Sequence, residues 1–314
     1  MNERQWKVLT TARPGEPEWH AAHKGKLGSR DVASLLRDAD GKRIGRRSPA
    51  DLWMTLTEKS KPEDISKDPA VMRGIALEPV LLELYARECG ETVTPYPGLI
   101  ENPDLPCVAV SADALVGMDT ARPGAVEGKT INPRYRSQWE TEGVPDLARV
   151  QGETIMWTLG LPRCVFVAYG LDRDEILSIE HDANPDARQM IGEAVTEFFE
   201  KYVKRDICPP AEVDDLAVFK RLYPSHVPGP VHQLSANWEI ELARKFELAK
   251  IATSAEKEIE AINARILEEM KGAEYAQTPG GIVIRARVEP RHYEAKPAHT
   301  IYPRVIRKVK GVGG

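Results

Sequence analysis

The clearest hydrophobic pattern in the chain lies in its last third. From Trp238 to Met270, apolar residues recur at every third or fourth position, which is the spacing of one face of an α-helix. We expect one long helix over about residues 235–271, ended by Gly272, with a strand at 282–288 after the turn at 279–281. Its length suggests that the apolar stripe packs across the core or pairs with another helix.

The first two thirds of the chain alternate helical and strand patterns. This order predicts an α/β core, a mixed central β-sheet flanked by helices, that ends near residues 209–210. We expect two domains, the core over residues 1–210 and a C-terminal extension over 211–314 that ends in a basic tail. Helices are expected from near Arg30, capped by Ser29, from Ser48–Pro49, and over 71–85, 146–160 and 185–204; strands are expected over 110–117, 125–131, 164–169 and 175–180.

Acidic side chains and one lysine fall on the two central strands. Asp113 lies in the first strand, and Glu127, Gly128 and Lys129 lie in the second, after the turn at 123–124. Because side chains alternate along a strand, Glu127 and Lys129 share a face. This pair of strands therefore predicts a cation site beside an ammonium group.

The Glu-x-Lys spacing alone is weak support, because it recurs at 269–271 and 294–296. The second copy lies in the predicted long helix, where residues two apart do not share a face. The third lies in a polar region with no acid-bearing strand before it. Only residues 127–129 have the required context.

Carboxylates in this arrangement suit phosphodiester hydrolysis. Mg²⁺ prefers oxygen ligands, and Asp113, Glu127, the Gly128 carbonyl and Glu78 from a nearby helix can supply them. The acidic cluster has room for a second ion, and Lys129 can orient a metal-bound water or stabilise developing negative charge. No P-loop, zinc spacing or serine-histidine-aspartate motif competes with this interpretation.

Composition sets the outer limits. A chain of 314 residues, 42 % of them hydrophobic, can bury a large core. It contains no apolar run of membrane-spanning length and no apolar segment typical of a signal peptide at its N-terminus, so we expect a cytoplasmic protein that does not bind membranes. The four cysteines are far apart, which predicts free thiols and argues against an iron–sulfur cluster.

The charge is uneven along the chain. The net charge is −5, yet residues 24–47 carry eight Lys or Arg against three Asp, and residues 285–310 carry eight against two Glu. Such segments suit a surface that follows phosphates, although solvated loops have the same composition. Within the first, a helix that begins near Ser29 beside His23, Lys26 and Arg30 could bind a phosphate or could be an ordinary surface helix.

Four motifs in a fixed order resemble a known family. They are Gly74-x-x-Leu77-Glu78-Pro79, Ser111-Ala-Asp113, Glu127-Gly-Lys129 and, from Gln151 to Trp157, a glutamine six residues before a tryptophan. Together they resemble the PD-(D/E)xK nucleases, most closely the YqaJ and phage lambda exonuclease branch, over about residues 18–205.

The resemblance implies a restriction-endonuclease-like core and a specific activity. Members of that branch are Mg²⁺-dependent 5′→3′ exonucleases that act on double-stranded DNA ends. Their ring-shaped trimers leave a 3′ strand for a single-strand annealing protein. For this chain the resemblance implies two Mg²⁺ ions, for which Mn²⁺ can substitute, and a phage or prophage gene expressed in a bacterial host.

The same resemblance assigns roles to residues. Asp113, Glu127 and Glu78 would be metal ligands, Lys129 would be catalytic, and Gln151 would support the site. In place of the arginine and serine that hold the 5′-phosphate in the family, this chain has His23 and Arg30. The residues expected to contact DNA or the 5′-phosphate are His23, Ser29, Arg30, Arg46, Arg47 and Arg73.

Two other functions remain open from sequence alone. An endonuclease of restriction or repair type could use the same core, and a catalytically inert DNA-binding protein could retain it. An exonuclease would leave a covalently closed circle intact, whereas an endonuclease would cut it.

Overall fold

The computed structural model describes residues 6–60, 67–95, 98–132, 135–170, 175–224 and 232–286. It comprises two compact units, Met1–Pro224 and Ser225–Gly314. Each is considered by itself.

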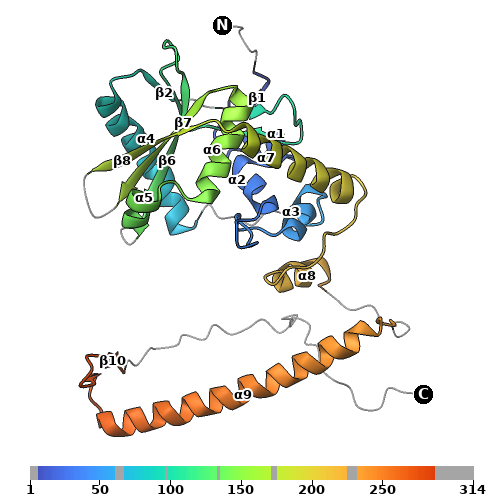
Figure 1. The fold of residues 1–314 in the computed structure, drawn as a ribbon, viewed down its shortest axis with the longest axis vertical. Helices are drawn as coiled ribbons and strands as arrows, with labels where there is room; N and C mark the ends of the chain where they lie inside the picture. Colours follow the sequence, from blue (N-terminus) through green and yellow to red (C-terminus); the bar gives the residue numbers. More distant parts are fainter. Residues whose placement is uncertain are drawn as a thin grey trace. The chain divides into compact units, whose positions relative to one another are not determined.

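A five-stranded mixed sheet forms the centre of the first unit (Figure 1). Its order is β2 (Val93–Pro95), β5 (Ala114–Val116), β6 (Gly124–Ile131), β7 (Arg163–Gly170) and β8 (Ile176–Asp182). Only β6 and β7 are parallel, and they are connected through α5 (Arg136–Glu142) and α6 (Asp146–Leu159). The remaining neighbours are antiparallel. The predicted mixed sheet flanked by helices is confirmed.

Helices cover both faces of this sheet and create two apolar cores. On one face, α4 (Pro69–Cys89) buries Leu81 and Tyr85 against Val126 of β6. On the other, α6 and α7 (Pro185–Phe198) bury Ile155 and Ile191 with Phe166 of β7. Strand β6 is therefore enclosed from both sides, as expected of a central strand in an α/β fold.

A second, three-stranded sheet was not predicted. It consists of β1 (Val8–Thr10), β3 (Leu99–Glu101) and β4 (Ala109–Val110), all antiparallel. The expectation of one strand over 110–117 was wrong, because β4 pairs in this small sheet whereas β5 pairs in the large one. Ser111 Oγ donates to the Gly98 carbonyl at 2.7 Å where the chain passes between the sheets, and Asp113 directly precedes β5.

The N-terminal helices are α1 (Pro17–His23), α2 (Ser29–Val32), a 3₁₀ turn (Ala33–Leu35) and α3 (Pro49–Leu56). The start of α3 is confirmed, since Ser48 Oγ accepts the Asp51 amide hydrogen at 3.1 Å. The predicted start of α2, with Ser29 as its N-cap, is not confirmed. Gly28 is its N-cap, and Ser29 is a buried first-turn residue without a capping hydrogen bond.

The first unit continues past residue 210. A π-helical turn (Phe199–Val203) follows α7, and α8 (Leu216–Leu222) contacts α3. Glu212 forms ion pairs with both Arg37 and Arg43. Residues 211–224, predicted to belong to the extension, therefore lie with the core, and the division between the units falls after Pro224.

The second unit contains the long helix that the sequence predicted. Helix α9 spans Asn237–Met270, and Lys271 ends it in the left-handed conformation. A hairpin of β9 (Tyr275–Gln277) and β10 (Val283–Arg285) follows. The predicted basic tail from residue 287 onward lies outside the described residues.

Two further expectations can be compared with the described residues. All four cysteines are free, and Cys164 is buried. In the described ranges, no helix combines the length and hydrophobicity that crossing a membrane requires.

Candidate active site

The site lies where β6 continues beyond the end of β5. Pairing of these strands reaches Ala114 opposite Val126, so the edge of β6 beyond this point faces Asp113 instead of a strand. Asp113 Oδ2 accepts a hydrogen bond from the Gly128 amide at 2.7 Å. Because the N–H and C=O of one strand residue point to the same edge, the Gly128 carbonyl is also directed to the Asp113 side.

Gly128 allows close approach of α4 to this edge. A Cβ at this position would lie 3.2 Å from Leu81 Cδ2 and 3.5 Å from Asp113 Oδ2. The first distance is tighter than ordinary packing, so a larger residue would require the Leu81 side chain to shift. Helix α4 also carries Glu78, half-buried and one turn before Leu81.

The opposite face of β6 carries Glu127 and Lys129. They form an ion pair, and Gln151 of α6 bonds to both partners. Gln151 Nε2 donates to Glu127 Oε1 at 2.7 Å, while Gln151 Oε1 accepts from Lys129 Nζ at 3.0 Å. Glu127 and Gln151 are buried, and about a quarter of the Lys129 side chain is exposed. The amide therefore fixes the orientation of both charged groups.

The three predicted metal-binding carboxylates influence one another. Burial raises the pKa of Asp113 well above its usual value, and the negative charges of Glu127 and Glu78 raise it further. Burial likewise raises the pKa of Glu78, with the charge of Glu127 acting in the same direction. These shifts are typical of clustered acids in need of a counter-cation.

An orphaned oxygen supports the same conclusion. Glu127 Oε2 is buried and has no hydrogen-bond partner within the described part of the chain, although buried carboxylate oxygens are normally satisfied. A divalent cation bound by this oxygen and by Asp113 would satisfy it and offset the repulsion. The described residues do not, however, gather three His, Cys, Asp or Glu side chains in a metal-binding cluster. The donor set that fits a cation is thus the orphaned Glu127 oxygen together with Asp113.

Much of the basic segment 24–47 is neutralised within the protein. Lys24 pairs with Glu58, Lys26 with Glu101, and Arg37 and Arg43 with Glu212. Arg47, a predicted DNA contact, pairs with Asp51 at 2.6 Å and donates to Thr55 Oγ1 at 2.5 Å. Its guanidinium group therefore holds α3 in place, and it is a poor candidate for binding phosphate.

Three other predicted DNA contacts remain available. Arg30, Arg46 and Arg73 are exposed, and none forms an ion pair within the described ranges. Arg30 lies in α2 and Arg73 in the exposed first half of α4, whose later turn carries Glu78. These positions can meet a polyanion without breaking an internal salt bridge.

His23 and Ser29 have different surroundings. The His23 ring stacks on Trp19 with centroids 4.6 Å apart, and burial lowers its pKa against the opposing effect of Asp31. At neutral pH this imidazole is therefore mainly uncharged. Ser29 is 7 % exposed. Of the residues predicted to contact the 5′-phosphate, His23 is thus a mainly neutral, stacked ring, whereas Arg30 is exposed.

Sequence reasoning missed Arg13. It lies between β1 and α1, and its positive charge, like that of Lys129, opposes the larger effects of burial and Glu127 that raise the pKa of Glu78. A single arginine in the turn before Pro14 and Gly15 carries no periodic or motif signal, so only the fold associates it with the carboxylates.

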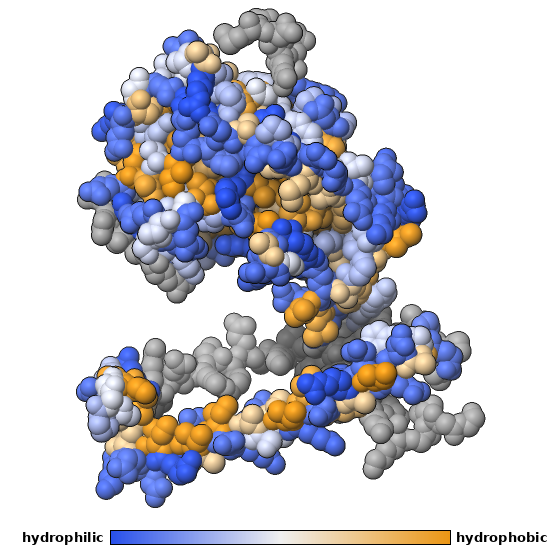
Figure 2. Space-filling model, viewed as in Figure 1, coloured by the Kyte–Doolittle hydropathy of each residue, from blue (hydrophilic) through white to orange (hydrophobic). Residues whose placement is uncertain are grey.

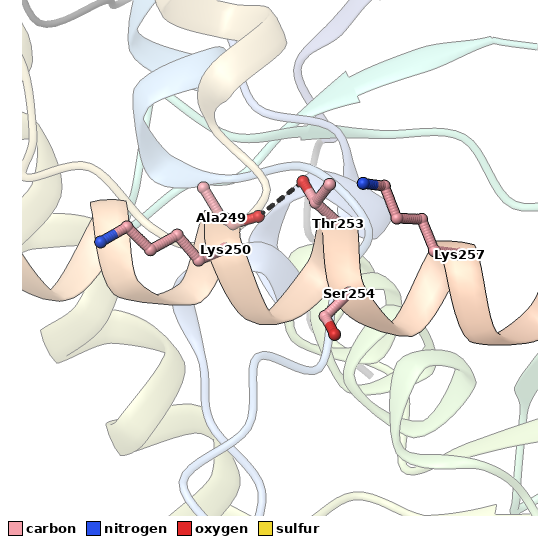
Figure 3. A pocket seen from close by; sticks show the side chains of 5 residues that line it. All are labelled: Ala249, Lys250, Thr253, Ser254 and Lys257. Carbon is pink, nitrogen blue, oxygen red and sulfur yellow. Dashed lines mark hydrogen bonds between the residues drawn. The ribbon is translucent and has the colours of Figure 1, made fainter.

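The hollow shown in Figure 3 belongs to the second unit, and none of these residues lines it. All five of its lining residues belong to α9: Ala249, Lys250, Thr253, Ser254 and Lys257. Thr253 Oγ1 donates to the Ala249 carbonyl of the preceding turn at 2.9 Å. The hollow contains no acidic group and no predicted site residue, so it adds nothing to the catalytic centre.

Comparisons with known proteins agree with this fold. Residues 18–162 match the family model of the YqaJ-like viral recombinase domain. An alkaline exonuclease from Laribacter hongkongensis is 26 % identical, with a TM-score of 0.50, over 61 % of this chain and 97 % of that one. Its structure in complex with dAMP is 25 % identical, with a TM-score of 0.52, over 66 % and 97 %. No curated protein matches the sequence.

The fold and these matches define the chain as a nuclease of the PD-(D/E)xK type. Within that class, the chain is similar to the YqaJ-like viral recombinase domain over residues 18–162, a little under half of its length.

Proposed function

We propose that this nuclease is a Mg²⁺-dependent 5′→3′ exonuclease that degrades one strand of linear double-stranded DNA and leaves 3′ overhangs. The arrangement of Asp113, Glu127, Lys129 and Gln151 at the free edge of β6 supports the proposal most directly. The similarity to an alkaline exonuclease over nearly that enzyme's whole length favours action at DNA ends. The overhangs would serve phage-type recombination by strand annealing.

The chain's own residues have separate roles in this proposal. Asp113 and Glu127 would hold Mg²⁺ or Mn²⁺, with the Gly128 carbonyl and Glu78 available for the same ion or a second one. When bound, the cation supplies charge neutralisation and lowers the pKa of a coordinated water. Gln151 holds the Lys129 ammonium beside Glu127. From there, Lys129 can orient the attacking water and stabilise negative charge on the scissile phosphate.

Binding of the DNA end uses a different set of groups. Arg30, Arg46 and Arg73 would contact backbone phosphates, and His23 would donate one neutral hydrogen bond near the 5′ end. The unpaired state of these arginines within the described ranges favours them over Arg47.

The family resemblance extends the proposal to assembly. Three copies would form a ring around the duplex, and a single-strand annealing protein would receive the exposed strand. The complex would act in the cytoplasm of a bacterial host that carries the phage or prophage.

One experiment separates the candidate functions. Linear duplexes labelled at the 5′ or 3′ end and a covalently closed circle are incubated with the protein in Mg²⁺ or in EDTA. We expect release of 5′ label only from linear DNA and only with Mg²⁺. Cutting of the circle would instead identify an endonuclease, and absence of all metal-dependent cleavage would identify an inert DNA-binding protein.

Variants connect that activity to the proposed site. Lys129→Ala and Asp113→Asn should each lower the degradation rate by at least about 10²-fold, because each removes charge from the reacting centre. Lys201→Ala and Asp119→Asn make the same chemical changes at exposed positions and should retain activity. Full activity in either site variant would contradict the mechanism.

A further inference from the structure

Helix α9 has an apolar stripe that nothing in the described residues covers. Of its 34 residues only Met270 is buried, whereas Leu248, Ile259 and Ile262 are 47, 57 and 40 % exposed. Figure 2 shows a band of hydrophobic surface along this helix. Because helices in water gain most of their stability from packing an apolar face, the band indicates a missing partner.

The spacing of the band identifies the kind of partner. Its six apolar positions from Leu248 to Ile266 are separated alternately by four and three residues, which is the seven-residue repeat of a left-handed coiled coil; the charged Lys245 and Glu269 continue the same spacing at the two ends. We call these eight positions the α9 seam. They are Lys245, Leu248, Ala252, Ala255, Ile259, Ile262, Ile266 and Glu269.

The α9 seam is complementary to itself when reversed. Its spacing is the same from either end, and its two ends carry opposite charges. In an antiparallel pair, Lys245 would lie opposite the partner's Glu269, and Leu248 opposite the partner's Ile266. The small Ala252 and Ala255 would then face the partner's Ile262 and the partner's Ile259, so that small residues accommodate large ones.

A parallel pair would lack this complementarity. Lys245 would face the partner's Lys245, and Glu269 would face the partner's Glu269, which is unfavourable in both cases. Ala252 and Ala255 would each meet alanine and leave gaps in the middle of the interface. We therefore propose that α9 forms an antiparallel two-stranded coiled coil with α9 of a second copy of this chain.

The geometry includes one unfavourable element. Near the two-fold axis, Glu256 would lie close to the partner's Glu256, and Glu258 would lie close to the partner's Glu258. Both are exposed and lie beside the α9 seam, where water and salt screen their repulsion. The face shown in Figure 3, with Lys250 and Lys257, points away from the seam and provides positions for control substitutions.

This pairing requires an even number of copies in solution. If the nuclease units form the proposed three-membered ring, α9 would join two rings into six copies. If they form no ring, α9 would produce a dimer. The pairing does not depend on the proposed nuclease activity and can be tested independently of it.

Exchange of charges in the full-length chain tests the register directly. Either Lys245→Glu or Glu269→Lys alone would place like charges opposite each other twice in each pair of helices. Each should raise the dissociation constant of the pair by about tenfold or more. The double variant should restore wild-type association. Lys250→Glu and Glu260→Lys make the same charge changes on the outer face and should have no effect. Light scattering and sedimentation over a concentration series provide the masses.

A second variant removes the apolar contact. Ile259→Asp combined with Ile262→Asp should halve the mass, while circular dichroism shows that helix content in the dissociated protein remains comparable to that of the charge variants. An odd-numbered wild-type assembly, or masses unaffected by every seam substitution, would overturn the proposal. Masses unaffected by every seam substitution would mean that residues 287–314 or another part of the same chain cover the stripe. Failure of the double charge exchange to restore association would exclude the antiparallel register.

Discussion

The side-chain amide of Gln151 donates a hydrogen bond to Glu127 Oε1 over 2.7 Å, which connects helix α6 to strand β6 at the centre of the sheet. The other end of the same amide accepts from Lys129. A glutamine is suited to this position because its primary amide presents a donor and an acceptor on two separate atoms.

Loss of this amide should impair catalysis more than folding. We expect Gln151→Ala to lower kcat by about 10- to 100-fold, as is usual for residues that orient metal ligands. KM for DNA should change little, because Gln151 is buried and contacts no exposed surface. Steady-state kinetics on linear duplex can measure both constants. Gln138→Ala, an exposed glutamine on α5, is the matched control, and an equal loss in both variants would contradict the orienting role.

Asp113 should destabilise the metal-free protein at neutral pH. Its folded pKa is raised, so the folded state disfavours the ionised carboxylate; this cost is absent below the unfolded pKa and grows as pH rises toward the folded pKa. Asp113→Asn should therefore increase the free energy of unfolding in EDTA at pH 7 by about 1 kcal/mol or more. Thermal or urea unfolding can measure it.

Mg²⁺ should reverse the order of stability of the wild type and Asp113→Asn. A cation that binds only the folded state stabilises it by mass action, so added Mg²⁺ should raise the Tm of the wild type but not that of Asp113→Asn. Asp119→Asn should respond to Mg²⁺ like the wild type. Equal stabilisation of all three proteins would show that the ion binds elsewhere.

Arg30, more than His23, should determine recognition of a 5′-phosphate. The pKa of His23 is lowered by burial, so the ring carries little charge above pH 6.5. Arg30→Ala should lower the rate on 5′-phosphorylated ends by about tenfold, with a smaller effect on 5′-hydroxyl ends. His23→Ala should have a weaker effect on the same ratio. Rates on the two kinds of end, measured with duplexes of identical sequence, provide the comparison, and an unchanged ratio in Arg30→Ala would exclude this role.

Glu101 should make the free energy of unfolding depend on pH in the acidic range. Its pKa is lowered chiefly by hydrogen bonds from Lys26 and Lys7, at 2.8 and 2.6 Å. The corresponding stability is fully present above the unfolded pKa near 4.5 and is lost as pH falls through the folded value. Glu101→Gln should lower the free energy of unfolding at pH 7 by about 1–3 kcal/mol. The difference from wild type should narrow below pH 4.5, and a difference independent of pH would contradict this explanation.

Local patterns predicted most of the large elements correctly. The mixed sheet, the helix after Ser48 and Pro49, the end of α6 at Gly160 and the long α9 all depend on periodicity, caps and turns within a short window. The proximity of Asp113 to Gly128 also followed, because the two strands are consecutive and joined by a short turn.

The remainder depends on contacts between distant segments. Strands β1, β3 and β4 are two or three residues long, too short for an alternating pattern, and β1 joins this sheet by pairing with residues of β3 about 90 positions away in sequence. Arg47 resembled a phosphate ligand because the sequence does not show its ion pair with Asp51 or its hydrogen bond to Thr55. The effect of Arg13 on Glu78 likewise arises only after folding.

The ion pairs of Glu212 determine where the chain can be truncated without disrupting the nuclease unit. A truncated protein that ended at residue 210 would leave Arg37 and Arg43 without this carboxylate and would uncover the apolar contacts of Val218. A truncation after Pro224 preserves both, because it coincides with the division between the two units. The shortest autonomous nuclease encoded by this chain is thus expected to end at Pro224, even though its predicted catalytic residues all precede Gly152.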